Sequence, residues 1–169
     1  MKANPVRGAL LALGLLLLSS WSAVAQERST RSGTQGTSTG LPVLLVPGWL
    51  GRLEDLSALR DRFVRDGWEE WEVKAVEFAD PVGSNRDHAR ELEEALGQLL
   101  ADTRANQADV VVHSMGGLAL WLLLQQKGES LPVRRVVFLG SPLQGTLTAY
   151  LAWGEGGEEM RPGAPAKKP

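Results

Sequence analysis

Four short runs of apolar residues recur along the chain, and each is bounded by residues typical of turns. The first run is continuously apolar, which is typical of a strand buried on both faces of a sheet. The second mostly alternates between apolar and polar positions, and the last two are rich in β-branched residues. These patterns predict strands, the fourth also buried, over Leu41 to Val46, Trp71 to Phe78, Asp109 to Val112 and Val133 to Leu139.

The segments between these runs carry helical patterns. Apolar residues at three- and four-residue spacing predict amphipathic helices over Leu53 to Asp66 and from a cap at Ser84 or Asn85 to about Thr103. The more uniformly apolar stretch from Leu118 to Gln126 predicts a buried helix. Strands that alternate with helices indicate an α/β fold: a parallel sheet of about four strands with helices on both faces.

The amino-terminal residues 1–25 have the pattern of a signal peptide. Lys2 and Arg7 precede the apolar run from Ala9 to Leu18, and Ala23-Val24-Ala25 fits the small-x-small rule for cleavage. The run is about half of the roughly 20 residues that span a bilayer, although a retained membrane anchor is the alternative. We therefore expect a protein that is secreted or periplasmic.

Composition divides the remaining chain into three parts. Residues 26–40 are rich in Ser, Thr and Gly with almost no apolar side chains, so they cannot bury enough surface to offset the entropy of ordering and are expected to form a flexible leader. Residues 41–153 contain the predicted strands and helices and form the expected folded domain. Residues 154–169 contain mainly Gly, Pro and charged residues, which predicts a disordered tail.

Charge and composition disfavour several classes of function. The net charge is −2, and the basic residues are scattered among acids, so no nucleic-acid partner is expected. The chain has no cysteine, which excludes disulfides, a thiolate nucleophile and thiolate-bound zinc. Two histidines far apart and no phosphate-binding glycine loop argue against a metal, a nucleotide or any other cofactor.

One turn carries residues with a chemical role. Val112-His113-Ser114-Met115-Gly116 nearly matches the nucleophile elbow G-x-S-x-G, in which a serine lies at a strained turn between a strand and a helix. Small residues are needed there because neighbouring backbone approaches closely. Val112 replaces the first glycine, but a strand is predicted before the turn and a helix after it. Ser114 is therefore the candidate nucleophile; the alternative is that it only caps the helix.

Four segments, together with a shorter one near the end, are similar to bacterial lipases and esterases of the α/β-hydrolase fold, of the triacylglycerol lipase kind. The elbow is the central one, and the others match the oxyanion loop, the loop before the long helix and the segment after the fourth strand. These segments are His113 to Gly117, Leu45 to Gly51, Asp80 to Asn85 and Leu139 to Thr146, with Met160 to Gly163 as the short extension. The resemblance implies a partial α/β-hydrolase fold.

The resemblance also implies roles for individual residues. Ser114 would attack an ester carbonyl, while the backbone N–H groups of Met115 and of Trp49 or its neighbour would hold the oxyanion. Trp49 and Leu50 would line an acyl-chain pocket, unless they only pack within their loop. Members of the family often have His-Gly where this chain has Pro47-Gly48, so the resemblance does not define the shape of this loop. The implied substrate is a lipid or a small ester. The resemblance is also compatible with contact between the protein and lipid surfaces.

The same family places an acid and then a histidine after the serine, and no histidine follows Ser114. His113 is adjacent to the serine, where neighbouring side chains point apart, and His88 is expected to be a solvated helix residue. No acid after the serine follows a predicted strand; these acids are Glu129, Glu155, Glu158 and Glu159. The sequence therefore predicts a chain that is truncated before its catalytic base, with the Val133 to Leu139 strand left as an open edge.

Three hypotheses follow from the missing base. The first is an exported ester hydrolase by descent that is inactive or weak in this chain. The second is a non-catalytic protein that retains the fold and binds lipids or acyl groups. The third is an enzyme that is completed by a histidine from another chain.

Overall fold

The computed structural model describes residues 40–164, in which four strands form one parallel sheet. The strands are β1 (Val43–Val46), β2 (Val73–Ala75), β3 (Ala108–His113) and β4 (Val133–Leu139), and their order across the sheet is β2-β1-β3-β4. This confirms the predicted α/β class and the four-stranded parallel sheet. The predicted signal peptide over residues 1–25 and the predicted leader over residues 26–40 lie outside the described residues, except for Gly40.

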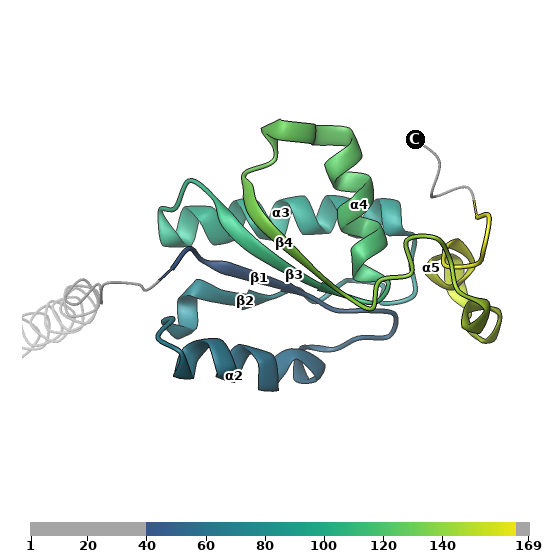
Figure 1. Cartoon of the computed structure of the whole chain (residues 1–169), viewed down its shortest axis with the longest axis horizontal. Helices are drawn as coiled ribbons and strands as arrows, with labels where there is room; N and C mark the ends of the chain where they lie inside the picture. The colour runs from purple at the N-terminus through teal and green to yellow at the C-terminus, as the bar shows by residue number, and fades with distance from the viewer. Residues whose placement is uncertain (1–39, 165–169) are drawn as a thin grey trace, which may run out of the picture. The chain divides into compact units, whose positions relative to one another are not determined.

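Helices cover both faces of the sheet, as predicted (Figure 1). The short 3-10 helix η1 (Leu53–Leu56) leads into α2 (Ser57–Arg65) on one face, while α3 (Asn85–Thr103) and α4 (Gly116–Lys127) lie on the other. Two further 3-10 turns, η2 (Glu70–Glu72) and η3 (Gly128–Ser130), precede β2 and β4. No helix within residues 40–164 has the length and apolar character needed to cross a membrane.

The continuous apolar run of β1 is explained by its burial on both faces. Val43 and Leu45 pack in the cluster on the α2 side, whereas Leu44 and Val46 pack in the larger cluster formed with α3 and α4. Successive side chains of a strand point to opposite faces, so a strand with helices on both sides needs an apolar residue at every position. β1 is therefore the centre of the described core.

β4 differs from this pattern, and the prediction that it is buried was wrong. Within residues 40–164 it pairs only with β3, as the edge prediction requires, but most of its side chains are exposed, including the large apolar residues Val137, Phe138 and Leu139. A bidentate ion pair joins its amino-terminal end to β3, with Arg134 Nε 2.9 Å from Asp109 Oδ1, and this hydrogen bond raises the pKa of Arg134. β4 therefore has the predicted strand conformation, but most of its side chains are not covered by other described residues.

α3 begins at the predicted cap and buries a histidine that was expected in solvent. The Ser84 hydroxyl accepts a hydrogen bond from the backbone N–H of Asp87. His88 is 1% exposed, stacks on Phe78 at a centroid distance of 4.0 Å, and its Nε2 lies 2.7 Å from the carbonyl oxygen of Asp80. The prediction was wrong because His88 lies one turn before Leu92 on the buried face of the helix.

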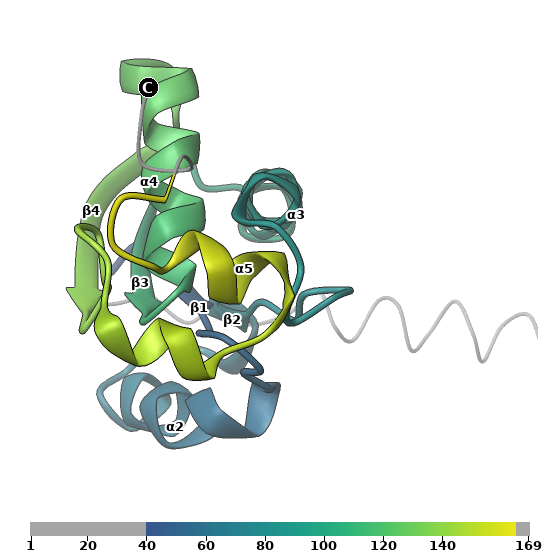
Figure 2. The same cartoon turned by 90° about the vertical axis from the view of Figure 1, so that its right-hand side faces the viewer.

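The segment after β4 is folded, so the predicted disordered tail was wrong for residues 154–164. The 3-10 helix η4 (Leu147–Leu151) is followed by α5 (Gly154–Glu159), and both lie at the carboxyl ends of the strands (Figure 2). Oε2 of Glu159 accepts hydrogen bonds of 2.7 Å from the backbone N–H and the side-chain amide of Asn85. Composition suggested disorder, but glycines here permit close packing: a Cβ on Gly156 would lie 2.6 Å from Met115 Sδ.

Candidate active site

Ser114 has the strained backbone of a nucleophile elbow. It lies between the end of β3 at His113 and the start of α4 at Gly116, and its φ angle is +50°. A residue with a side chain adopts this left-handed region at a cost, and such strain persists only where the surroundings impose it. Here the backbone N–H of Ser114 donates a 2.9 Å hydrogen bond to the carbonyl of Leu139 at the end of β4.

The two glycines after the serine are required by close contacts. A Cβ on Gly116 would lie 2.3 Å from the carbonyl oxygen of Pro47, and one on Gly117 would lie 2.1 Å from Ser141 Oγ. Val112, which stands where the motif has its first glycine, is fully buried in the core between the sheet and α3 and α4. The core therefore provides the room that a β-branched side chain needs at this position.

The loop after β1 passes directly over the serine. A Cβ on Gly48 would lie 2.8 Å from Ser114 Cβ and 3.3 Å from its Oγ, so only glycine allows this approach. Leu50 donates its backbone N–H to the carbonyl of Pro81 at 3.1 Å. Within residues 40–164 the N–H groups of Trp49 and Met115 form no hydrogen bond. Of Trp49 and Leu50, only Trp49 thus has a backbone N–H without a hydrogen-bond partner among the described residues.

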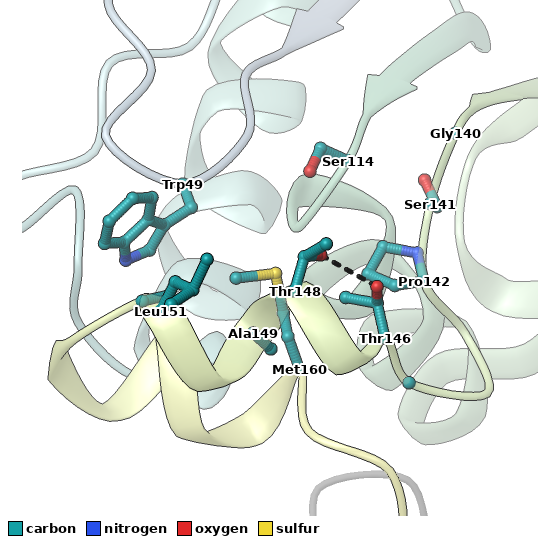
Figure 3. A pocket seen from close by; sticks show the side chains of 12 residues that line it. Trp49, Ser114, Gly140, Ser141, Pro142, Thr146, Thr148, Ala149, Leu151 and Met160 are labelled. Atoms are coloured by element: carbon teal, nitrogen blue, oxygen red, sulfur yellow. Dashed lines mark hydrogen bonds between the residues drawn. The ribbon is translucent and has the colours of Figure 1, made fainter.

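Ser114 lines two cavities that share only one other residue, Trp49. One has a volume of about 680 Å³ and lies toward η4, and the other, of about 570 Å³, lies toward α2. Figure 3 shows the larger cavity, with Trp49 and Leu151 on one side and Ser141 and Pro142 on the other. Trp49 is held by a 3.0 Å hydrogen bond from its Nε1 to the carbonyl of Trp153.

Leu50 is placed differently from Trp49. It lines neither of the two cavities that contain Ser114, its side chain is 40% exposed, and its φ angle is +57°. Residues that the sequence did not single out line the larger cavity instead, among them Ser141, Thr146 and Met160. All three lie in segments that carried the family resemblance, and that resemblance was the feature of the sequence that could have identified them.

Neither histidine is hydrogen-bonded to Ser114. His113 is exposed, and its Nδ1 lies 3.2 Å from the point where a Cβ on Gly48 would stand, on the same side of that loop as Ser114 Oγ. His88 is buried against Phe78 on α3. In the described part of the chain no acid is hydrogen-bonded to His113, and no three His, Asp or Glu residues cluster in a way that could hold a metal.

Comparison with known proteins supports the fold. No protein-family model matches the chain. Among solved structures, the chain is similar to Bacillus licheniformis lipase BlEst2 in its mature form, with a TM-score of 0.63, 16% identity and coverage of 78% of this chain and 65% of that one. For its propeptide form the TM-score is 0.65 and the identity 18%, with 77% and 32% covered.

A phospholipase shows the same likeness. PlaB from Legionella pneumophila, in complex with thio-NAD, aligns with a TM-score of 0.65 and 15% identity over 76% of this chain and 32% of that one. The chain thus has the partial α/β-hydrolase fold of bacterial lipase and phospholipase structures. It spans between 32% and 65% of the length of these three structures.

Proposed function

We propose that this chain carries the nucleophile and substrate cavities of an exported serine ester hydrolase that acts on acyl esters or lipids. The observation that carries the proposal is Ser114, held at φ +50° between a strand and a helix and lining two cavities. The likeness to lipase and phospholipase structures supports the same reading. Export through the predicted signal peptide would place the protein in a periplasm or outside the cell.

In the proposed reaction Ser114 Oγ forms a bond to the ester carbonyl carbon while its proton passes to a base. The backbone N–H groups of Met115 and Trp49 would stabilise the negative oxygen of the tetrahedral intermediate. The bond from carbon to the alcohol oxygen then breaks, the alcohol leaves with a proton, and an acyl ester of Ser114 remains. Water then attacks the acyl carbon while one of its protons passes to the base, the bond from that carbon to Ser114 Oγ breaks, and the serine takes the proton back as the acid leaves.

Neither His88 nor His113 is proposed as the base that accepts the proton of Ser114. His88 is buried with its Nε2 against the carbonyl of Asp80, and His113 forms no hydrogen bond with Ser114 Oγ. A serine hydroxyl is a weak nucleophile without an adjacent base. We therefore propose that residues 26–169 turn over esters weakly or not at all by themselves, with the base supplied by another polypeptide segment or chain.

Free imidazole is expected to replace the missing base and allow acylation of Ser114. Residues 26–169 incubated with p-nitrophenyl octanoate and imidazole should gain the mass of one octanoyl group on Ser114, because the serine lines open cavities that a small base can enter. Intact-protein and peptide mass spectrometry would read the adduct. Ser114→Ala should abolish it, while Ser130→Ala, which removes an exposed hydroxyl on η3, should retain it.

A non-catalytic protein that binds acyl groups is the second candidate. The absence of a base hydrogen-bonded to Ser114 in the described residues, beside two intact cavities, favours it. It differs from the first candidate in the imidazole experiment: a folded chain that binds an acyl probe equally well with Ser114→Ala but gains no octanoyl group at Ser114 would be a binding protein. Labelling of Ser114→Ala to the same extent would also contradict the proposed nucleophile.

Contact with lipid surfaces is expected to use the segment 147–153, which comprises η4 and the two residues after it. Four large side chains in this uncharged stretch are exposed by 60% or more: Leu147, Tyr150, Leu151 and Trp153. Such exposed apolar patches are typical of interaction sites. Leu151→Asp should weaken binding to phosphatidylcholine vesicles by about tenfold or more, since an inserted leucine contributes roughly 1.5–3 kcal/mol.

Vesicle flotation or sedimentation would measure this change. Trp71→Asp is the matched control, because Trp71 is also exposed but precedes β2, at the end of the parallel sheet opposite to Ser114. Equal weakening by both substitutions would show that η4 is not a specific contact.

A further inference from the structure

The turn at residues 80–83, between β2 and α3, is hydrogen-bonded to two segments that are distant from it in the sequence. The backbone N–H of Leu50 donates a 3.1 Å hydrogen bond to the carbonyl of Pro81. The backbone N–H of Gly156 donates one of 3.0 Å to the carbonyl of Val82. Leu50 belongs to the loop after β1 and Gly156 to α5, so the turn links this loop to α5.

Trp49 is held between the same two segments. Its Nε1 donates to the carbonyl of Trp153, the residue before α5, and the two indole rings meet edge to face with their centroids 4.5 Å apart. The next residue of the loop, Leu50, is fixed to the turn through Pro81. The backbone N–H of Trp49, which we propose as an oxyanion donor, therefore depends on the turn both through Leu50 and through α5.

His88 ties this turn to α3. Its Nε2 lies 2.7 Å from the carbonyl oxygen of Asp80, which also accepts a 3.0 Å hydrogen bond from the backbone N–H of Gly83. A carbonyl oxygen can only accept, so Nε2 carries the hydrogen and donates it to this bond. The imidazole is 1% exposed and stacks on Phe78 at an interplanar angle of 18°, so its position is set by the core.

Packing alone does not explain a histidine at this position. Nδ1 of His88 is buried and has no hydrogen-bond partner among the described residues, and burial of such an atom costs free energy. A phenylalanine would stack on Phe78 in the same way without burying a polar group. What His88 adds to the fold is therefore the one hydrogen bond from Nε2 to Asp80.

We propose that His88 is a positioning residue: through Asp80 it fixes the turn at residues 80–83, and through the turn it places the backbone N–H of Trp49 for the oxyanion. The inference rests on the proposed function, because it takes Trp49 as an oxyanion donor. His88 contacts neither the substrate nor Ser114. It acts through geometry, since a displacement of about 1 Å in a site can cost on the order of a hundredfold in rate.

Three substitutions separate the donor from the packing of the ring. His88→Phe keeps an aromatic ring on Phe78 and removes the donor, whereas His88→Gln loses the ring and places an amide N–H near the position of Nε2. Leu99→Val removes a buried methylene further along the same face of α3 and is the control for reduced stability. Urea unfolding would verify that each variant is folded and measure its loss of stability.

The first measurement is imidazole-dependent acylation of Ser114 in residues 26–169 over a range of p-nitrophenyl octanoate concentrations. In His88→Phe the maximal rate constant should fall roughly ten- to hundredfold, while the half-saturating ester concentration stays unchanged, because an oxyanion donor acts in the transition state. His88→Gln and Leu99→Val should stay within about threefold of the wild-type rate constant, since both retain a donor to Asp80.

Hydrogen exchange followed by NMR tests the anchor without any chemistry at Ser114. The backbone N–H groups of Leu50 and Gly156 should exchange roughly three- to tenfold faster in His88→Phe, which is the value of one hydrogen bond. In His88→Gln both groups should exchange as they do in the wild type.

Three results would overturn the proposal. Wild-type exchange at Leu50 and Gly156 in His88→Phe would mean that His88 does not fix the turn. Acylation as slow in His88→Gln as in His88→Phe would assign the effect to the packing of the ring, and faster exchange with unchanged acylation would exclude the placement of Trp49. If the wild type gains no octanoyl group, the proposed nucleophile fails, while hydrogen exchange still decides whether His88 fixes the loop after β1.

Discussion

Residues 26–169 are expected to hydrolyse a short p-nitrophenyl ester at the same rate with Ser114 as with Ser114→Ala when no external base is added. Loss of the histidine from a serine hydrolase removes on the order of 10⁶ in kcat, roughly 8 kcal/mol of transition-state stabilisation. Neither histidine of this chain is hydrogen-bonded to Ser114. The N–H groups of Met115 and Trp49, which we propose as oxyanion donors, cannot replace the proton acceptor.

A spectrophotometric rate measurement with butyrate as the acyl group would check this expectation, with the oligomeric state of the sample recorded. A rate above background that Ser114→Ala abolishes would contradict it and would mean that a base is present. His113→Ala would then separate two sources: loss of the rate would identify His113, which lies beside the same loop as Ser114. A rate per chain that falls on dilution would instead indicate a base from a second chain.

Gly116→Ala is expected to destabilise the folded chain strongly, whereas Gly97→Ala should stabilise it. A Cβ on Gly116 would stand 2.3 Å from the carbonyl oxygen of Pro47, so the loop after β1 would have to move away from α4. Overpacking of this kind costs roughly 1–3 kcal/mol, and backbone is harder to displace than a flexible side chain. Gly97 lies within α3 with no atom within 4 Å of the added methyl group.

The matched substitution at Gly97 should raise the free energy of unfolding by about 0.5–1 kcal/mol, because alanine loses less backbone entropy in a helix. Urea unfolding followed by circular dichroism would give both values. If Gly116→Ala were as stable as the wild type, the close contact between the loop and the elbow would not be a feature of the folded chain.

Most secondary structure was predictable because its signals are local. The apolar run of β1 and the spacing of leucines in α3 are visible within a few residues, and the elements observed there match the predictions within a few positions. Residues 154–164 were predicted wrongly because their composition is that of a tail. Their order comes from partners far along the chain, such as the pairing of Glu159 with Asn85 over a separation of 74 residues.

The two histidines show the same limit at the level of single residues. The burial of His88 depends on Phe78 and on the carbonyl of Asp80, which pack against α3 from outside the helix. A helical pattern defined only by leucines does not include it. For His113, adjacency to Ser114 was evident, but the loop at Gly48 that lies beside both side chains was not.

The sequence by itself determined the order of strands and helices, the parallel α/β class and Ser114 as the residue at the strand-to-helix turn, because each depends on hydrophobic period or on residues next to one another. Only the tertiary structure decided which groups surround that serine. The contact of Gly48 with Ser114 and the bond from Trp49 to Trp153, 104 residues apart, form when distant segments pack at the carboxyl ends of the strands. Such contacts depend on how the whole domain closes, and no local pattern encodes them.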